Sequence, residues 1–169
     1  MTAPDACAGC GFVYDDIAAG DIAPMLGGLA ARWRTFLTGM DAAAARRRPS
    51  PAVWAPLEYA CHVRDVLLTQ RDRVIVALAE DTPTFAPIYR DQRVAWARYD
   101  QEDVNAVADH IAMAAHLLAT VLSSLTPEQL ARPCVYNYPE PSVRDVAWIG
   151  RHTVHEAAHH LADVTAITG

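Results

Sequence analysis

The sequence predicts an all-α protein built as a four-helix bundle, and three observations support this fold class. Apolar residues recur every three or four positions in four separate segments, which is the spacing of one helix face. No segment alternates apolar and polar residues between hairpin turns, as half-buried strands do. The chain of 169 residues is 52% apolar, which is enough for one domain to bury a core without disulfides.

The first half of the chain contains two of the helices. The first helix begins near Asp21, a favourable N-cap, and its apolar face continues to Met40. Three arginines followed by two prolines, at residues 46–51, end this helix and are typical of a solvated loop. The second helix covers residues 53–80, and the connection at residues 81–99 contains two prolines and then a candidate short helix.

The second half contains the other two helices. The third covers residues 102–125 and has the cleanest apolar periodicity in the chain. Thr126 followed by proline is a start signal for a further short helical turn. After a turn-rich loop, the fourth helix is expected to begin at Ser142, where Asp145 completes a capping box, and to end near Ile167.

Composition and charge argue against two classes of function. The net charge of −6 disfavours a nucleic-acid partner, because phosphate binding needs a basic face. No apolar run approaches the roughly 18 residues of a membrane span. The chain opens without a basic and apolar leader, so we expect a cytoplasmic protein with reduced thiols. Residues 1–20 form a tail, and residues 21–169 form the bundle.

Four of the seven histidines lie between residues 152 and 160, in the expected fourth helix. The spacing of His152, His155 and His159 puts them on one helix face. Two imidazoles four residues apart can hold one ion, so His155 and His159 are candidate ligands for Zn, with Ni or Fe as alternatives. The third ligand must come from another helix, and His62 is the best candidate.

Further side chains near these ligands are candidates for supporting them. Glu58 and Asp65 lie four residues before and three residues after His62, and ligating imidazoles usually donate their second N–H to a carboxylate. His152 and His160 would have the same supporting role on the fourth helix.

The fourth helix also contains two motifs of other metalloenzymes. Residues 155–159 read H-E-x-x-H, the zinc-protease motif, but no suitable third ligand follows and no substrate-binding strand is predicted. Glu156-x-x-His159 is half of a di-iron carboxylate site, but the further carboxylates that such a site needs are too few. We therefore favour a mononuclear site.

Two short motifs resemble signatures of the DinB/YfiT-like family. Residues 54–62 carry the pattern W-x-x-x-E-x-x-x-H, and His155-x-x-x-His159 resembles the second signature. The similarity extends from about residue 20 to residue 167. It implies a four-helix bundle that holds one metal ion through His62, His155 and His159.

The family resemblance also implies a function. Family members include mycothiol- and bacillithiol-dependent S-transferases and maleylpyruvate isomerases, which implies a metal-dependent thiol transferase. The last ligand has an alternative in His160, but we choose His159 because His160 is rotated by about 100° on the helix. Three neutral ligands would leave an open position where a thiol could ionise. The predicted partners are a small-molecule thiol and an electrophile.

Four residues are candidate substrate contacts. Trp54, Tyr136 and Tyr138 could line the mouth of the site, where the second and fourth helices diverge. Arg144, near the start of the fourth helix, could meet an acidic thiol or substrate. For each of them, packing or a surface salt bridge is the alternative role.

The N-terminal tail adds a Cys7-x-x-Cys10 pair, while Cys61 and Cys134 are isolated and expected to be structural. The pair looks like half of a zinc ribbon. Three interpretations remain: a disordered tail, a partial metal site completed by a histidine or a second chain, and a thiol pair lying over the active site. A second metal or redox site at Cys7 and Cys10 is thus one of them.

Three classes of function remain at this point. The first is the metal-dependent thiol transferase. The second is a non-catalytic metal-binding or regulatory protein that uses the histidines and the cysteine pair. The third is a structural bundle with incidental histidines; an exposed bundle face is compatible with a homodimer. An open coordination position beside a pocket would favour the enzyme, and a closed ligand shell would favour the second class.

Overall fold

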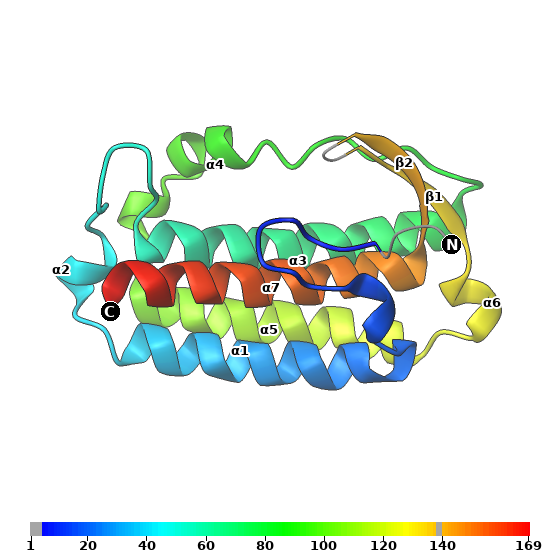
Figure 1. The fold of residues 1–169 in the computed structure, drawn as a ribbon, viewed down its shortest axis with the longest axis horizontal. Coiled ribbons are helices and arrows are strands. Elements are labelled where there is room, and N and C mark those ends of the chain that lie inside the picture. Colours follow the sequence, from blue (N-terminus) through cyan, green and yellow to red (C-terminus); the bar gives the residue numbers. More distant parts are fainter. Residues whose placement is uncertain (1–4, 138–139) are drawn as a thin grey trace.

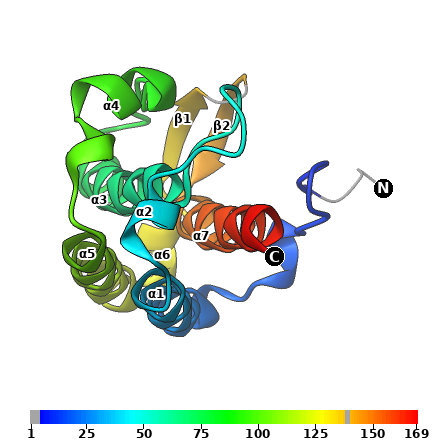
Figure 2. The same ribbon diagram turned by 90° about the vertical axis from the view of Figure 1, so that its left-hand side faces the viewer.

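The computed structural model describes residues 5–137 and 140–169, and four long helices make up its body (Figure 1). These are α1 (Ile22–Thr38), α3 (Pro56–Ala79), α5 (Val104–Ser123) and α7 (Val146–Thr168). Both α1 and α3 pack against α5 and α7, so that α1 and α3 lie diagonally across the bundle (Figure 2). The predicted four-helix bundle is confirmed.

Short helical elements connect the long helices. They are η1 (Tyr14–Asp16), η2 (Ala19–Asp21), α2 (Ala42–Ala45), α4 (Arg90–Trp96), η3 (Tyr99–Gln101) and α6 (Pro127–Leu130). The short helix expected between the second and third long helices is α4. The start signal at Thr126 also acts as predicted: its Oγ1 accepts from Gln129 N at 3.3 Å, and Gln129 Oε1 accepts from Thr126 N at 2.9 Å.

The core of the bundle lies along α5, the most apolar of the long helices. By length and composition, α5 is the one helix in the described part of the chain that could span a membrane. Its buried side chains pack toward α1 and α3, as the core helix of a bundle requires. They include Val107, Ala108, Ile111, Ala115 and Leu118.

A small β-hairpin precedes α7; the all-α class holds, but the expectation that the chain contains no strand is wrong. Strand β1 (Pro133–Asn137) pairs antiparallel with β2 (Pro141–Asp145). The residues expected to start the fourth helix form β2 instead, so α7 begins at Val146 and Asp145 caps it, accepting from Trp148 N at 2.6 Å. The hairpin is short and rich in proline, which hides the alternation that marks a strand.

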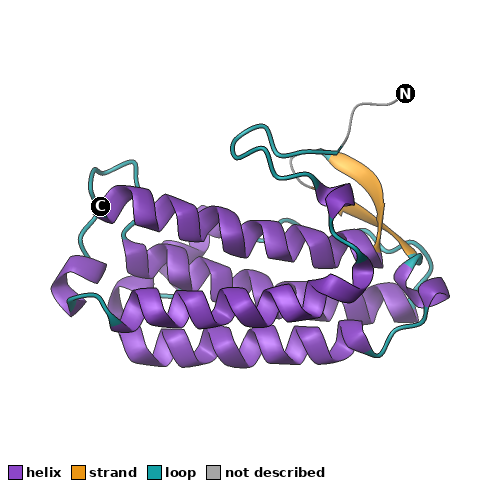
Figure 3. Ribbon diagram, turned by 60° about the horizontal axis from the view of Figure 1, so that its bottom comes forward, coloured by secondary structure: helices purple, strands orange, loops and turns teal. Residues whose placement is uncertain are grey.

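The N-terminal segment forms an ordered loop that lies over α7, at the hairpin end of the bundle (Figure 3). An antiparallel bridge between Ala6 and Val13 closes this loop. Tyr14 and Ile17 then bury their side chains in the core of the bundle. The described part of the tail, from residue 5, is therefore packed on the bundle.

Asp65 of α3 fastens the connection between α3 and α5. Its carboxylate accepts from Tyr99 Oη at 2.6 Å, from Arg93 Nη1 at 3.1 Å and from Arg64 Nε at 2.9 Å. Arg93 and Tyr99 belong to the connection between α3 and α5, and residues 87–92 are part of the same connection. Because Asp65 and Tyr99 are buried, this contact holds that segment beside α3.

We expect Tyr99→Phe to lower the free energy of unfolding by about 1.5–3 kcal/mol, the contribution of a hydrogen bond to a charged group. Urea denaturation measures this change. Tyr89→Phe is the matched control, because Tyr89 lies in the same connection and is exposed, and we expect it to change stability by less than about 0.5 kcal/mol. Equal losses in both variants would contradict the role assigned to the Asp65 contact.

Candidate metal centre

Three side chains from two helices converge inside the bundle and form the main candidate centre. His62 projects from the middle of α3, and Glu156 and His160 project from α7. The Nε2 atoms of His62 and His160 each lie 3.6 Å from Glu156 Oε2. We call this group the His62 centre.

The spacing within the His62 centre fits a metal ion better than a set of hydrogen bonds. Separations of 3.6 Å are too long for normal hydrogen bonds. Around a tetrahedral zinc ion with bonds of about 2.0–2.1 Å, the ligand atoms stand about 3.3–3.4 Å apart. Two histidines and a glutamate also recur as the protein ligands of catalytic zinc sites, where a fourth position stays open. The donor set and its spacing therefore suit a divalent cation.

Glu156 is the negative charge among these imidazoles. Its Oε1 also lies 3.4 Å from His155 Nδ1 and 3.9 Å from His152 Nε2. Burial would raise the pKa of Glu156, but the surrounding His155, His160 and His62 side chains hold that pKa well below its usual range. Glu156 is thus a carboxylate at neutral pH, as a ligand must be.

A cavity of about 430 Å³ opens beside the His62 centre. Its wall includes two of the three converging side chains, His62 and Glu156. The full lining is His62, Val66 and Gln70 of α3, residues 87–92 of the connection, Tyr136 of β1, and His152 and Glu156 of α7. Among these residues there is no serine, threonine, cysteine or lysine, so the described lining offers no thiol, aliphatic hydroxyl or amine as a nucleophile. A larger depression, of about 720 Å³, lies near the C-terminal ends of α1 and α7, away from these groups.

His152 lies in the cavity wall rather than among the converging ligands of the His62 centre. Its ring stacks on Trp148, with centroids 4.7 Å apart, and its Nδ1 lies 3.3 Å from Tyr14 Oη. Burial lowers the pKa of His152 to about 4, so its imidazole is neutral at physiological pH. It therefore contributes a neutral polar group to the cavity.

The three predicted metal ligands fall into two clusters. His62 lies with Glu156 and His160, whereas His155 and His159 lie with Cys7 and Cys10 of the N-terminal loop. No group of converging ligand atoms in the described residues contains His62 together with His155 or His159. The two clusters are separate because His155 and His159 face a different direction on α7 from Glu156 and His160. Each pair is spaced by four residues, and the second pair is displaced from the first by one residue, which is about 100° around the helix. His160, the alternative to His159 as the last ligand, lies with His62 in this structure, and His159 does not.

The two carboxylates expected to support His62 engage other groups instead. Glu58 forms a paired contact with Arg48, with both N···O distances 2.7 Å, and accepts from Ala55 N at 2.7 Å. It thereby ties the arginine-rich loop to the start of α3. Asp65 binds the connection, as described above. Nδ1 of His62 is buried and has no hydrogen-bond partner among the described residues.

The four predicted substrate contacts lie in different environments. Tyr136 lines the cavity, and its Oη is held by Gln70 Nε2 at 2.7 Å and Arg73 Nη1 at 2.9 Å. Trp54 packs its ring 5.4 Å from the His62 ring but is outside the cavity lining. Arg144 forms an ion pair with Asp5 of the N-terminal segment, with Nη1 2.7 Å from Oδ2. Tyr138 lies outside the described residues.

Cys61 and Cys134 are buried, and their thiols are not activated. Burial raises the pKa of Cys61 to about 12 and that of Cys134 to about 11, so both stay protonated thiols. The two N-terminal cysteines differ from each other: burial raises the pKa of Cys10, whereas for Cys7 the effect of burial is outweighed by the backbone of Cys10 and Gly9, which lowers its pKa. The expectation of structural roles for Cys61 and Cys134 thus fits their surroundings.

The sequence interpretation considered Glu156 only within the protease and di-iron motifs that it set aside, and did not include it among the candidate ligands of a mononuclear site. The signal was present as Glu156-x-x-x-His160, which has the same spacing as His155-x-x-x-His159. Tyr14 was missed as well, although its Oη lies 3.2 Å from His155 Nδ1 and 3.3 Å from His152 Nδ1. Nothing in the sequence marks Tyr14, because its partners are more than a hundred residues away.

Comparisons with known proteins agree on the fold. YfiT from Bacillus subtilis, described as a probable metal-dependent hydrolase with an unusual four-helix bundle topology, superposes with a TM-score of 0.79 at 15% sequence identity. That alignment covers 99% of this chain and 91% of YfiT. The mycothiol-dependent maleylpyruvate isomerase, both unmodified and as a single-residue variant, superposes with a TM-score of 0.72 at 12% identity. Here 90% of this chain aligns, but it spans only 63% of the isomerase.

Sequence comparison identifies the family. No curated protein gives a significant match to the sequence. The family model of the DinB superfamily, by contrast, matches residues 26–164, which include all of α3 and α5 and most of α1 and α7. With this match and the shared four-helix architecture, the chain belongs to the DinB superfamily.

Proposed function

We propose that the protein is a metal-dependent enzyme that transfers a small-molecule thiol to an electrophile, with the ion held by His62, Glu156 and His160. The observation that carries this proposal is the convergence of these three side chains beside the 430 Å³ cavity, whose wall includes His62 and Glu156. A ligand set that borders a cavity suits a catalytic ion, because a substrate can reach the position that the protein leaves open.

The ion, for which zinc is our first choice, would supply a Lewis acid that lowers the pKa of a bound thiol. The protein's part is to hold the ligands. Asp163 Oδ2 lies 2.9 Å from His160 Nδ1, which orients His160 and leaves its Nε2 facing Glu156. Glu156 supplies one negative charge, so the loaded centre would keep a net positive charge beside the cavity.

The composition of the cavity supports a nucleophile that comes from outside the protein. Its described lining offers no thiol, aliphatic hydroxyl or amine, and it combines the apolar side chains of Val66 and Ile88 with polar groups at Gln70 and Arg90. Such a surface suits two small molecules: a polar thiol cofactor at the polar groups and an apolar or uncharged electrophile at the apolar side chains. The mycothiol dependence of the structurally similar isomerase agrees with this choice.

Hydrolysis is the second candidate function. YfiT, which aligns over nearly the whole chain, is described as a probable metal-dependent hydrolase. The same ligand set could serve either reaction, because a divalent ion lowers the pKa of a bound water as well as that of a thiol. The two candidates differ in one requirement, which is the added thiol.

The experiment compares metal-free protein with protein reloaded with zinc. Each is mixed with an electrophile panel, first with mycothiol, bacillithiol or glutathione and then without a thiol, and products are identified by mass spectrometry. We expect a thioether product that needs both zinc and thiol. Zinc-dependent hydrolysis without a thiol would favour the second candidate. Zinc binding without any turnover would favour the non-catalytic metal-binding protein and overturn the proposed enzyme.

A further inference from the structure

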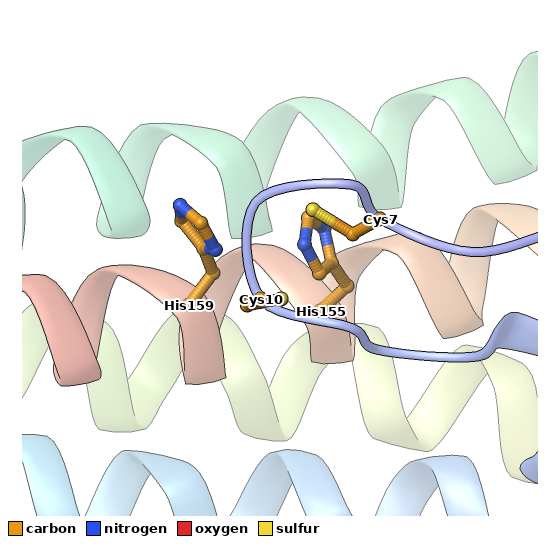
Figure 4. Close-up of side chains that lie close together, drawn as sticks. All are labelled: Cys7, Cys10, His155 and His159. Carbon is orange, nitrogen blue, oxygen red and sulfur yellow. The ribbon is translucent and has the colours of Figure 1, made fainter.

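A second cluster of ligands lies on the other side of Glu156, outside the His62 centre. Cys7 and Cys10 of the N-terminal loop meet His155 and His159 of α7 (Figure 4). One ligand atom from each of the four residues lies within 4.8 Å of every other. We call this group the cysteine–histidine cluster. Two thiols and two imidazoles are the ligand set of closed, structural zinc sites.

The two imidazoles of the cluster each keep one nitrogen without a partner. His155 Nε2 and His159 Nδ1 are buried atoms with no hydrogen-bond partner in the described part of the chain. Their other nitrogens face supporting groups: His155 Nδ1 lies 3.2 Å from Tyr14 Oη, and His159 Nε2 lies 3.6 Å from Asp163 Oδ2. A metal-binding histidine has this arrangement, with one nitrogen for the ion and the other for a second group. A buried imidazole nitrogen without any partner would otherwise cost stability.

The backbone of the N-terminal loop brings both thiols to this position. Gly11 N donates to Cys7 O at 2.8 Å, and Cys7 N donates to Phe12 O at 2.8 Å, which closes a tight turn around the cysteine pair. Gly11 has φ of +73°, a left-handed conformation that favours glycine.

The loop also lies directly on α7. A Cβ atom at Gly9 would lie 3.5 Å from His159 Cε1 and 3.7 Å from Cys7 Sγ, which is ordinary contact. Phe12 packs its ring 5.1 Å from the His155 ring and 5.2 Å from the Tyr14 ring. The cluster therefore forms where two segments separated by more than 140 residues are packed together, and not by chance proximity of mobile side chains.

We propose that Cys7, Cys10, His155 and His159 form a second, closed metal site that binds one Zn²⁺ and fastens the N-terminal loop to α7. Four protein ligands fill a tetrahedral shell, so this ion would have no open position for a substrate. Its role is structural, and the proposal does not depend on turnover at the His62 centre. The sequence offered this site as one of three interpretations of the cysteine pair, completed by a histidine.

A disulfide between Cys7 and Cys10 is the competing chemistry for the same residues. It would leave the two buried imidazole nitrogens without a partner, whereas an ion would satisfy both of them. A disulfide forms by losing two protons and two electrons to an oxidant, and a metal site forms by losing only the two thiol protons. The two outcomes are therefore distinguished by titrating reduced protein with metal.

The test is a titration of reduced, metal-free protein with Co²⁺, whose thiolate complexes absorb in the near ultraviolet. The His62 centre contains no sulfur, so this charge-transfer band reports on the cysteine–histidine cluster alone. We expect the band to saturate at one equivalent of bound Co²⁺ and to bleach when Zn²⁺ is added. Total zinc should reach two equivalents per chain when both sites are filled.

Three variants separate the two sites. Cys10→Ala is expected to lose the band and one equivalent of zinc, while Cys134→Ala, which removes a buried thiol outside the cluster, should keep both. His62→Ala should keep the band and lose only the equivalent that binds without sulfur. No thiolate band in reduced wild-type protein, or a band that survives in Cys10→Ala, would overturn the proposed site. If wild-type protein showed the thiolate band but bound no zinc at the His62 centre, that result would contradict the proposed function and leave the cysteine–histidine site standing.

Discussion

Replacing Glu156 by alanine is expected to empty the His62 centre and abolish the proposed activity. Glu156 is the charged member of the centre, with its Oε2 3.6 Å from Nε2 of both His62 and His160. Changing a residue that only supports a ligand costs about 10–100-fold in metal affinity. Losing a ligand should therefore cost at least about 100-fold, with turnover at limiting zinc falling in proportion. Competition with a zinc indicator measures the affinity directly.

The control for this experiment is Glu128→Ala, which removes an exposed carboxylate from α6. It should bind zinc with wild-type affinity. Glu156→Ala should also keep the Co²⁺–thiolate band of the cysteine–histidine cluster, which shows that α7 is folded. If Glu156→Ala bound zinc at the His62 centre as tightly as wild type, Glu156 would not be a ligand.

The largest expected effect on stability comes from Trp33→Ala. Trp33 on α1 is fully buried, and its Nε1 donates to Ala157 O on α7 at 2.9 Å. Trp33 is therefore hydrogen-bonded to the backbone of α7 one residue after Glu156. Truncating a buried tryptophan costs about 3–5 kcal/mol, because the side chain leaves a cavity and the lost contacts are only partly recovered. Urea denaturation, followed by circular dichroism, measures the change.

Trp96→Ala is the matched control, since this tryptophan on α4 is 80% exposed. We expect it to change the free energy of unfolding by less than about 0.5 kcal/mol. The contrast between the two variants is the prediction. Similar losses of unfolding free energy in both variants, or a Trp33→Ala protein as stable as wild type, would contradict the claim that Trp33 is a core residue between α1 and α7.

Helical periodicity predicted the bundle because each long helix buries one face. The expected ends of the first three long helices lie within about three residues of the observed ones, since Pro56 at the start of α3 and the residues after Ala79 and Ser123 interrupt the pattern. The hairpin before α7 was missed because its strands are short and rich in proline, and because part of its support comes from a distant segment. Thr84 and Phe85, for example, join β1 from the distant α3–α5 connection.

The candidate centre was predicted only in part, for a geometric reason. Periodicity identifies which residues share a face of α7, but it does not say which face points to α3. His155 with His159 and Glu156 with His160 are equally spaced pairs, and only the packing of the bundle separates them. Cys7 and Cys10 could not be joined to His155 from the sequence, because that contact depends on how a long N-terminal loop folds back.

The central claim is that α7 divides its ligands between two metal sites. Its most direct test is a crystal structure of zinc-loaded protein, with diffraction data collected on both sides of the zinc absorption edge. We predict two anomalous peaks, one among His62, Glu156 and His160 and one surrounded by the four residues of the cysteine–histidine cluster. A single peak, bound by His62 together with His155 and His159, would contradict this account.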